Sequence, residues 1–109
     1  MMPQKSQRNK KRYIAFTVHA PRSISRKEFI SAIRENIKDK NSWNRIKPWL
    51  TVFADNEGIL RCSHSAKDEA IALLSSITTC GRENIKIKVE TKATSGTIKK
   101  AKRKISKIQ

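Results

Sequence analysis

The sequence predicts an α+β fold in which two helices cover one face of a four-stranded antiparallel sheet. Two periodicities support this prediction, because segments with apolar residues at every second position alternate with segments that repeat at helical spacing. The chain has 109 residues, which suits one domain with one modest core. A third observation bears on function: 25 Lys and Arg stand against 9 Asp and Glu, and the resulting net charge of +16 attracts polyanions.

The chain begins with a predicted strand and a predicted helix. Residues 13–20 alternate as a strand does, with an inward face of Ile14, Phe16 and Val18. Ser25 and Glu28 then form a capping-box pair, which satisfies amide groups at the start of a helix. The buried stripe of that helix is Ile30, Ile33 and Ile37. Residues 39–47 fit neither period, so we expect a loop there, with at most a turn of helix.

A hairpin is predicted in the middle of the chain. Residues 49–54 are aromatic and β-branched, which favours a strand, and residues 59–64 return as its partner. The segment Asp55-Asn56-Glu57-Gly58 between them is typical of a hairpin turn, in which we expect Gly58 to take the positive φ.

The second half predicts a helix, a strand and a further helix. Ser65 and Asp68 indicate a second helix cap, followed by a buried stripe of Ala70, Leu73, Leu74 and Ile77. Residues 84–91 alternate strictly, with Ile85, Ile87 and Val89 inward. Ile98, Ala101, Ile105 and Ile108 keep helical spacing in a Lys-rich run, which predicts a basic amphipathic helix over residues 97–108.

The resulting order, β-α-β-β-α-β, is that of a ferredoxin-like (RRM-like) sandwich, here with an added basic C-terminal helix. We expect residues 12–109 to form one domain. Residues 1–11 are predicted to be a disordered basic tail, because they contain no apolar period to offset the cost of ordering.

The positive charge is concentrated at the two ends. Residues 1–12 contribute +5 and residues 98–109 contribute +6. The candidate phosphate-binding cations at these ends are Lys10, Lys11, Arg12, Lys99, Lys100, Lys102, Arg103 and Lys104. Residues 94–97, just before the last helix, are expected to leave free N–H groups that suit a phosphate oxygen.

Nucleic acid is the partner that this charge favours over a membrane. No apolar run approaches the roughly 20 residues that span a bilayer. The basic N-terminal residues have no apolar stretch behind them, so we expect no signal peptide and a cytoplasmic location.

No catalytic or metal constellation stands out. Cys62 and His64 supply two possible metal ligands of the usual four, with His19 far off in sequence. His64 alone is more often structural than a general base, and Cys62 and Cys80 are expected to be core thiols rather than a disulfide. A ferredoxin-like hydrolase is therefore only a distant alternative, and we expect no catalytic residue, metal or cofactor in this chain.

Aromatic residues offer a second kind of surface. The strand 59–64 lacks the stacking aromatics of an RRM, which disfavours base stacking in the RRM manner. Trp49 and Phe53 share one side of the second strand, and Tyr13 lies on one side of the first. If these aromatic residues lie on the helix-free face of the sheet, they are open to a partner protein or to RNA bases. Alternatively, they lie beneath the last helix or the segment 39–47.

Five segments resemble the family of small ribonuclease P proteins that archaea and eukaryotes share. They are KKRYIAF, SRKEFISAI, KPWL, GILRCSH and SGTIKKAKRK, in the expected order, and GILRC followed by SGTIK is the most specific pair. The chain departs from the family pattern at residues 39–47, where a glycine-containing loop is expected. The runner-up is another small RNA-binding protein, of the ribosomal type.

The resemblance implies an RRM-like subunit that pairs with a barrel-shaped ribonuclease P protein. The pair supports a catalytic RNA that removes 5′ leaders from precursor tRNA, with Mg²⁺ at the active site of the RNA. The residues of the two matching motifs become candidates for RNA or partner contact: Arg61, Ser95, Gly96, Thr97, Lys99 and Lys100. Tyr13, Trp49 and Phe53 become candidates for contact with the partner protein.

Overall fold

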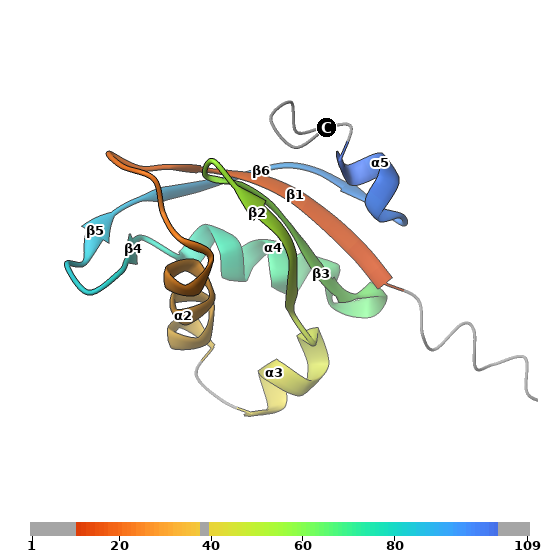
Figure 1. Cartoon of the computed structure of the whole chain (residues 1–109). Helices are drawn as coiled ribbons and strands as arrows, with labels where there is room; N and C mark the ends of the chain where they lie inside the picture. The colour runs from red at the N-terminus through yellow and green to blue at the C-terminus, as the bar shows by residue number, and fades with distance from the viewer. Residues whose placement is uncertain (1–10, 38–39, 103–109) are drawn as a thin grey trace, which may run out of the picture.

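The computed structural model describes residues 11–37 and 40–102 (Figure 1). Its strands are β1 (Lys11–His19), β2 (Trp49–Ala54), β3 (Glu57–Ser63), β4 (Thr79–Cys80), β5 (Ile85–Lys86) and β6 (Lys88–Ser95). Its helices are α2 (Arg26–Asn36), α3 (Lys40–Ile46), the 3₁₀ turn η1 (His64–Ala66), α4 (Lys67–Ser76) and α5 (Ile98–Lys102). The predicted tail lies outside the described residues except for Lys11, the first residue of β1, and the predicted end of the last helix also lies outside them.

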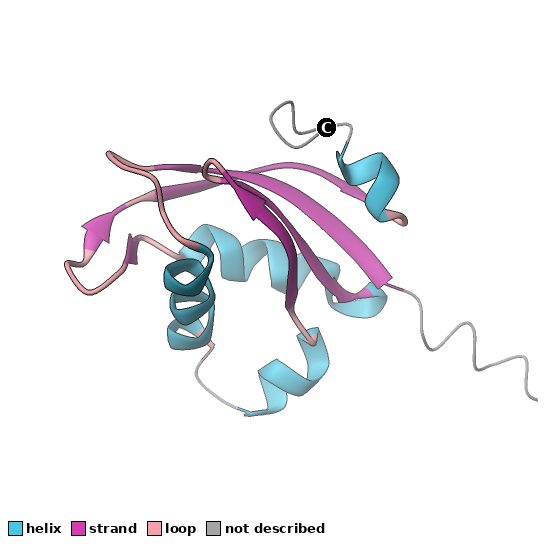
Figure 2. Cartoon of the chain, viewed as in Figure 1, coloured by secondary structure: helices cyan, strands magenta, loops and turns pink. Residues whose placement is uncertain are grey.

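A four-stranded antiparallel sheet organises the fold, with the strand order β2-β3-β1-β6. Helices α2 and α4 cover one face of this sheet, and α5 lies on the other (Figure 2). Strands β4 and β5 pair separately as a small second sheet. The predicted α+β class and the four-stranded antiparallel sheet are thus confirmed.

The main core lies between the sheet and the helices α2 and α4. Most of the predicted stripe residues form this core: Ile14, Phe16, Val18, Ile33, Leu73, Leu74 and Ile77 are all buried. On α2 the predicted Ile30 and Ile37 are only partly buried, whereas Phe29, which the stripe did not include, is fully buried. The capping box of α2 is present as predicted, with the Glu28 amide donating to Ser25 Oγ at 3.1 Å and the Ser25 amide donating to Glu28 Oε1 at 3.0 Å.

Residues 40–46 form a helix, where the sequence led us to expect a loop. Ile46 is buried in the core and holds the end of α3 in place, whereas Trp43 in its middle is 37% exposed. One buried residue in a short helix leaves no visible period, which explains the error.

The second predicted helix cap is also wrong. Ser65 lies within the 3₁₀ turn η1, and α4 begins after Ala66, with no capping bond from a side chain. Ala66 is 1% exposed, so the chain enters α4 through a buried apolar residue instead of a polar cap.

The predicted strand 84–91 is divided at Ile87. The Ile87 amide donates to the Thr78 carbonyl at 2.9 Å, so β5 pairs with β4, while β6 joins the main sheet and runs on to Ser95. The alternation itself is unaffected, since Ile87 and Val89 are both buried.

The hairpin between β2 and β3 turns at Asp55 and Asn56, which have φ angles of 53° and 61°. Gly58 therefore does not supply the positive φ, contrary to our prediction. It lies in β3, where a Cβ would stand 2.7 Å from the Val52 carbonyl oxygen and 2.8 Å from the rings of Phe16 and Phe53. Its missing side chain makes room for those rings.

Candidate nucleic-acid interface

The described parts of the two basic ends, residues 11–12 and 98–102, meet at one end of the sheet. Tyr13, near the start of β1, pairs with Arg61 of β3 on one side and with Ser95 of β6 on the other. This arrangement gathers Lys11, Arg12, Arg61, Ser95, Gly96, Thr97 and the lysines of α5, and we call this set the basic end (Figure 1). Nine of the twelve predicted RNA-binding residues lie in it, and Lys10, Arg103 and Lys104 lie outside the described residues.

Gly96 lets Arg12 approach the backbone at the basic end. The Arg12 Nη1 atom lies 3.0 Å from the position that a Cβ on Gly96 would occupy. Lys11, Arg12, Gly96 and His64 line a hollow of about 290 Å³ beside this contact. His64 is the one lining residue that the sequence did not nominate for RNA contact, because it reaches the hollow only through the turn η1 that follows β3.

Helix α5 is anchored so that its lysines face outward. Ala101 is fully buried with Ala15 of β1 and Ile59 of β3, and Ile98 packs beside them. Lys99, Lys100 and Lys102 are consequently exposed. Helical spacing alone predicted both the buried and the exposed side of α5.

Two amide groups at the start of α5 are bonded within the chain. The Thr97 amide donates to Ser95 Oγ at 3.2 Å, and the Lys100 amide donates to Thr97 Oγ1 at 3.3 Å. The predicted free N–H groups are therefore fewer than the sequence suggested. The lysine side chains, rather than the helix terminus, are the main positive groups of this segment.

The acidic residues of the sheet lie at the opposite end. Glu57 of β3 and Glu90 of β6 both pair with Thr17, near the end of β1. His19 Nε2 lies 2.8 Å from Glu90 Oε1, and this hydrogen bond lowers the pKa of the Glu90 carboxyl.

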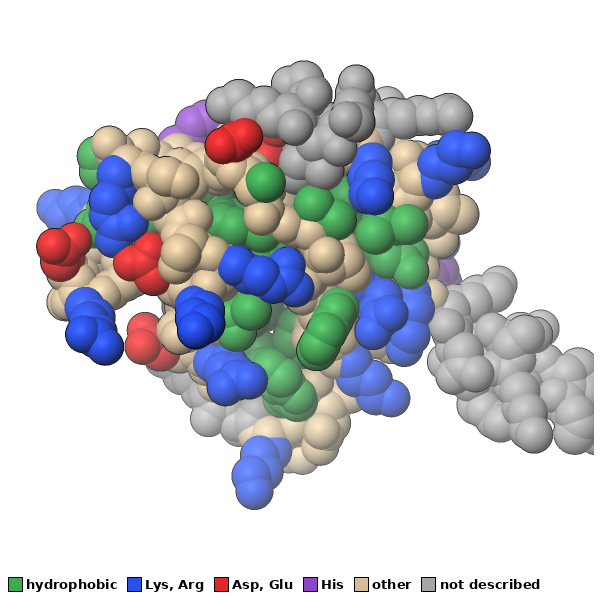
Figure 3. Space-filling view, viewed as in Figure 1, with side chains coloured by type: hydrophobic (Ala, Val, Ile, Leu, Met, Phe, Trp, Pro, Cys, Tyr) green, Lys and Arg blue, Asp and Glu red, His purple; other side chains and the backbone are tan. Residues whose placement is uncertain are grey.

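A second ion pair near the same end neutralises another carboxylate. Arg22 Nη2 lies 2.7 Å from Glu28 Oε2, and the hydrogen bond from Arg22 lowers the pKa of Glu28 to about 2. At the basic end, by contrast, no described carboxylate lies within ion-pair distance of Lys11, Arg12 or Arg61. Figure 3 shows the same division, since the visible Asp and Glu side chains lie away from the start of β1.

The three aromatic candidates do not share one face. The register of β2 shifts between Leu50 and Val52, and this irregularity turns Phe53 into the core, against Phe29 at a ring-centroid distance of 5.1 Å. Trp49, which is 59% exposed, and Tyr13, which packs beside α5, lie on the opposite face of the sheet. The prediction that Trp49 and Phe53 lie on one side of the strand is therefore wrong.

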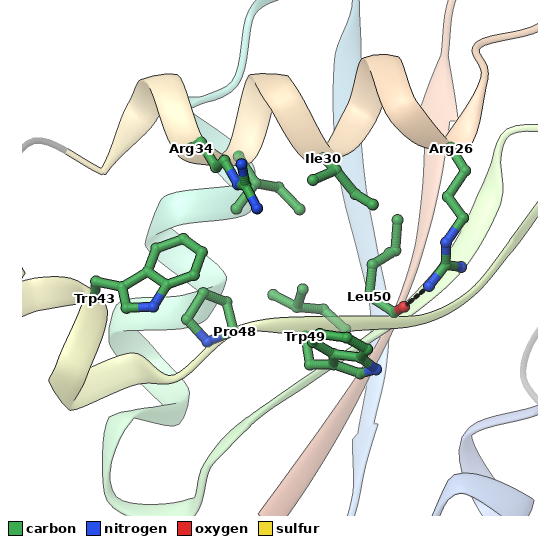
Figure 4. A pocket seen from close by; sticks show the side chains of 9 residues that line it. Arg26, Ile30, Arg34, Trp43, Pro48, Trp49 and Leu50 are labelled. Atoms are coloured by element: carbon green, nitrogen blue, oxygen red, sulfur yellow. Dashed lines mark hydrogen bonds between the residues drawn. The ribbon is translucent and has the colours of Figure 1, made fainter.

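The sequence also missed a groove between α2, α3 and β2 (Figure 4). It has a volume of about 210 Å³, and its lining includes Trp43, Pro48, Trp49 and the α2 residues Arg26 and Arg34. Arg26 donates to the backbone carbonyl of Leu50 at its edge. No sequence signal revealed the groove, because its wall is the helix that we expected to be a loop.

The two cysteines of the chain are both buried, free thiols. Cys62 and Cys80 are free and buried, as predicted for core thiols, and burial raises the pKa of Cys62 to about 11. Within residues 11–37 and 40–102, His, Cys, Asp and Glu side chains do not form the groups of three that a metal ion would need.

None of the helices in these ranges has the length and apolar character to cross a membrane.

Comparison with known proteins places this architecture in a family. A sequence model of the Rpp14/Pop5 family matches residues 12–106. The chain belongs to the Rpp14/Pop5 family. The match includes every described residue of the basic end except Lys11.

Archaeal members of the Rpp14/Pop5 family are similar over most of the chain. Proteins named ribonuclease P protein component 2 from Methanococcus aeolicus and Methanocaldococcus jannaschii are 33% and 34% identical, over 93% and 94% of this chain and 76% and 77% of their own lengths. The protein of the same name from Archaeoglobus fulgidus is 30% identical over 94% of both chains.

A solved structure shares the fold. It is a chain in the cryo-EM structure of yeast ribonuclease MRP, with a TM-score of 0.68 and 12% identity over 82% of this chain and 76% of that chain. At this level of identity the likeness concerns the fold alone.

Proposed function

We propose that this chain is an RNA-binding protein subunit of ribonuclease P. In this role it supports the catalytic RNA in the endonucleolytic removal of 5′ leaders from precursor tRNA. Membership of the Rpp14/Pop5 family over residues 12–106 carries the proposal, since the archaeal relatives are named as ribonuclease P components. The chain thus belongs to an endoribonuclease holoenzyme as a component.

The basic end is the surface that we assign to RNA. Lys11, Arg12 and Arg61 extend from adjacent strands, and the exposed lysines of α5 continue the same positive region. Phosphate groups bind to Lys and Arg with release of counterions, so such a surface neutralises the RNA backbone without reading its sequence. Ser95, Gly96 and Thr97 add short polar groups and an approachable backbone beside these cations.

The other roles follow from the same family. We propose that the fold is a ferredoxin-like, RRM-like sandwich, which the strand order β2-β3-β1-β6 and the placement of α2 and α4 on one face support. A barrel-shaped ribonuclease P protein is the proposed protein partner, and the RNA is proposed to hold the Mg²⁺ that assists the hydrolysis. The cytoplasm is the proposed place of work.

Sequencing the RNA that co-purifies with the tagged protein tests this proposal. We expect enrichment of the ribonuclease P RNA together with the other protein subunits. Enrichment of ribosomal RNA and ribosomes would contradict the proposal and favour the ribosomal alternative.

A reconstituted cleavage assay gives a second test. The purified chain with Mg²⁺ is expected to leave precursor tRNA uncut, whereas its addition to the RNA and partner proteins increases correct leader removal. Correct cleavage by the chain alone, abolished by His64→Ala, would refute a purely supporting role.

A further inference from the structure

We infer that Tyr13, Arg61 and Trp49 form a row on which unpaired bases of a single-stranded RNA segment stack. The inference rests on the proposed function and deepens it, since it adds base contacts to a surface assigned so far only to phosphates. These three residues come from three adjacent strands, which are β1, β3 and β2 respectively.

The strand register places the three side chains side by side. Tyr13 pairs with Arg61, and Arg61 pairs with Trp49, so all three lie on the same face of the antiparallel sheet. Neighbouring strands lie about 4.8 Å apart, and two such steps give a row roughly 10 Å long, enough for two bases.

The row lies at the edge of α5, and Tyr13 packs against the cluster that contains Ala101. The preceding pair on the same face, Ala15 and Ile59, is fully buried with Ala101 of α5. Two residues further along each strand, Tyr13 and Arg61 are half-buried. Exposure on this face thus increases from Ala15 and Ile59 to Tyr13 and Arg61.

Trp49 completes the row at the edge of the sheet. Figure 4 shows the Trp49 indole on the side of β2 away from α2, while Leu50 points toward that helix. Trp49 also borders the groove described above, so it lies at the rim between that groove and the row. The indole is 59% exposed and is available to a ligand.

The chemistry of the row favours bases over an apolar peptide. Bases stack on aromatic rings and on the flat guanidinium of Arg, and Arg61 lies between the two aromatic side chains. Lys11 precedes Tyr13 by two residues on β1, so it lies on the same face beside the row, and no described carboxylate lies within ion-pair distance of it. A base on the row thus has a cation beside it for its phosphate.

The RRM signature in the sequence could not reveal this row. That signature requires aromatic residues on the strand equivalent to β3, whereas here β3 contributes Arg61 and the flanking strands contribute the rings. The side chains meet only through pairing between strands that are distant in sequence.

Tryptophan fluorescence tests the inference on the full chain, which has two tryptophans. The variant Trp43→Phe reports Trp49 alone, and its matched control Trp49→Phe reports Trp43 alone. Each is titrated with single-stranded oligouridylate RNA and with an RNA duplex of equal length, while fluorescence anisotropy of the labelled RNA measures binding independently.

We expect the single strand to quench Trp49 saturably and the duplex to quench it less, with Trp43 unchanged. Trp49→Ala is expected to weaken single-strand binding about tenfold and duplex binding hardly at all. Arg61→Lys keeps the charge but loses the flat stacking group, so single-strand affinity falls severalfold while its salt dependence stays the same.

Two results would overturn base stacking while the phosphate contacts stand. One is unchanged Trp49 emission while the RNA is bound, and the other is parental affinity of Trp49→Ala combined with a reduced salt dependence in an α5 lysine variant. A Trp49 signal that responds only to the barrel-shaped protein would assign the row to a protein contact instead. Failure of the chain to bind either RNA at low salt would refute the row and the RNA-binding function together.

Discussion

The three exposed lysines of α5 allow a quantitative test of the RNA surface. Replacing Lys99, Lys100 and Lys102 by Gln removes three charges but leaves the anchor Ala101 in place, fully buried against the sheet. Lys and Gln have nearly equal helix propensity, so the stability of the fold is expected to change little. Any loss of RNA affinity then reports lost contacts.

The expected size of the effect follows from counterion release. Each phosphate contact on a single strand contributes about 0.7 to the slope of log affinity against log salt, so three contacts contribute about 2. Over a fourfold increase in salt, a slope of about 2 changes the affinity about 16-fold. The variant is therefore expected to bind more weakly at low salt and to lose less affinity as salt rises.

Affinity is measured by fluorescence anisotropy from low to high salt, with several unrelated RNA sequences. The matched control replaces Arg82, Lys86 and Lys88 by Gln, because these three residues are also exposed but lie between β4 and the first residue of β6, away from the basic end. The control has the same change of net charge and is expected to keep the slope near that of the parent. Equal slopes for all three proteins would refute the assignment of α5 to RNA and attribute its charge to general solubility.

Three further predictions concern the fold. Gly58→Ala is expected to lower the free energy of unfolding in urea by about 1–3 kcal/mol, because a Cβ there collides with the ring of Phe53; an unchanged urea midpoint would contradict this packing. Glu28→Gln is expected to reduce stability at neutral pH, since hydrogen bonding from Arg22 lowers the folded pKa of Glu28 to about 2. The contribution of that carboxylate is lost as pH falls from about 4.5 toward 2, so the thermal midpoints of variant and parent should converge there, and a constant gap would disprove the linkage. Ala101→Glu is expected to undock α5, because burying a carboxylate costs several kcal/mol, and hydrogen exchange of α5 amides should accelerate more than about tenfold while β1 keeps its protection.

The sequence predicted those parts of the fold in which one buried stripe dominates. Ile14, Phe16 and Val18 alternate because a single face of β1 meets the main core, and Leu73 and Leu74 repeat because one side of α4 does. The residues of the basic end could also be predicted, because runs of Lys and Arg are visible in the sequence without knowledge of which strands pair.

The missed features depend on contacts between distant segments. The register shift after Leu50 turns Phe53 toward Phe29, and a shift of one residue reverses the face of a strand without changing its composition. Ala15 is buried on the second face only because α5 returns to cover it. The alignment of Tyr13 with Trp49 depends on β3 lying between their strands, which no local pattern encodes.

The central position of β1 has a consequence for synthesis of the protein. β1 is made first, yet its neighbours are β3 and β6, and β6 is the last strand of the sheet to leave the ribosome. Pairings between such distant segments form slowly, and β1 keeps an unpaired edge until β6 arrives. Because Tyr13 meets Ser95 only in that final step, a nascent chain lacks the assembled basic end. The surface that we propose for RNA is therefore complete only after β6 has left the ribosome and paired with β1.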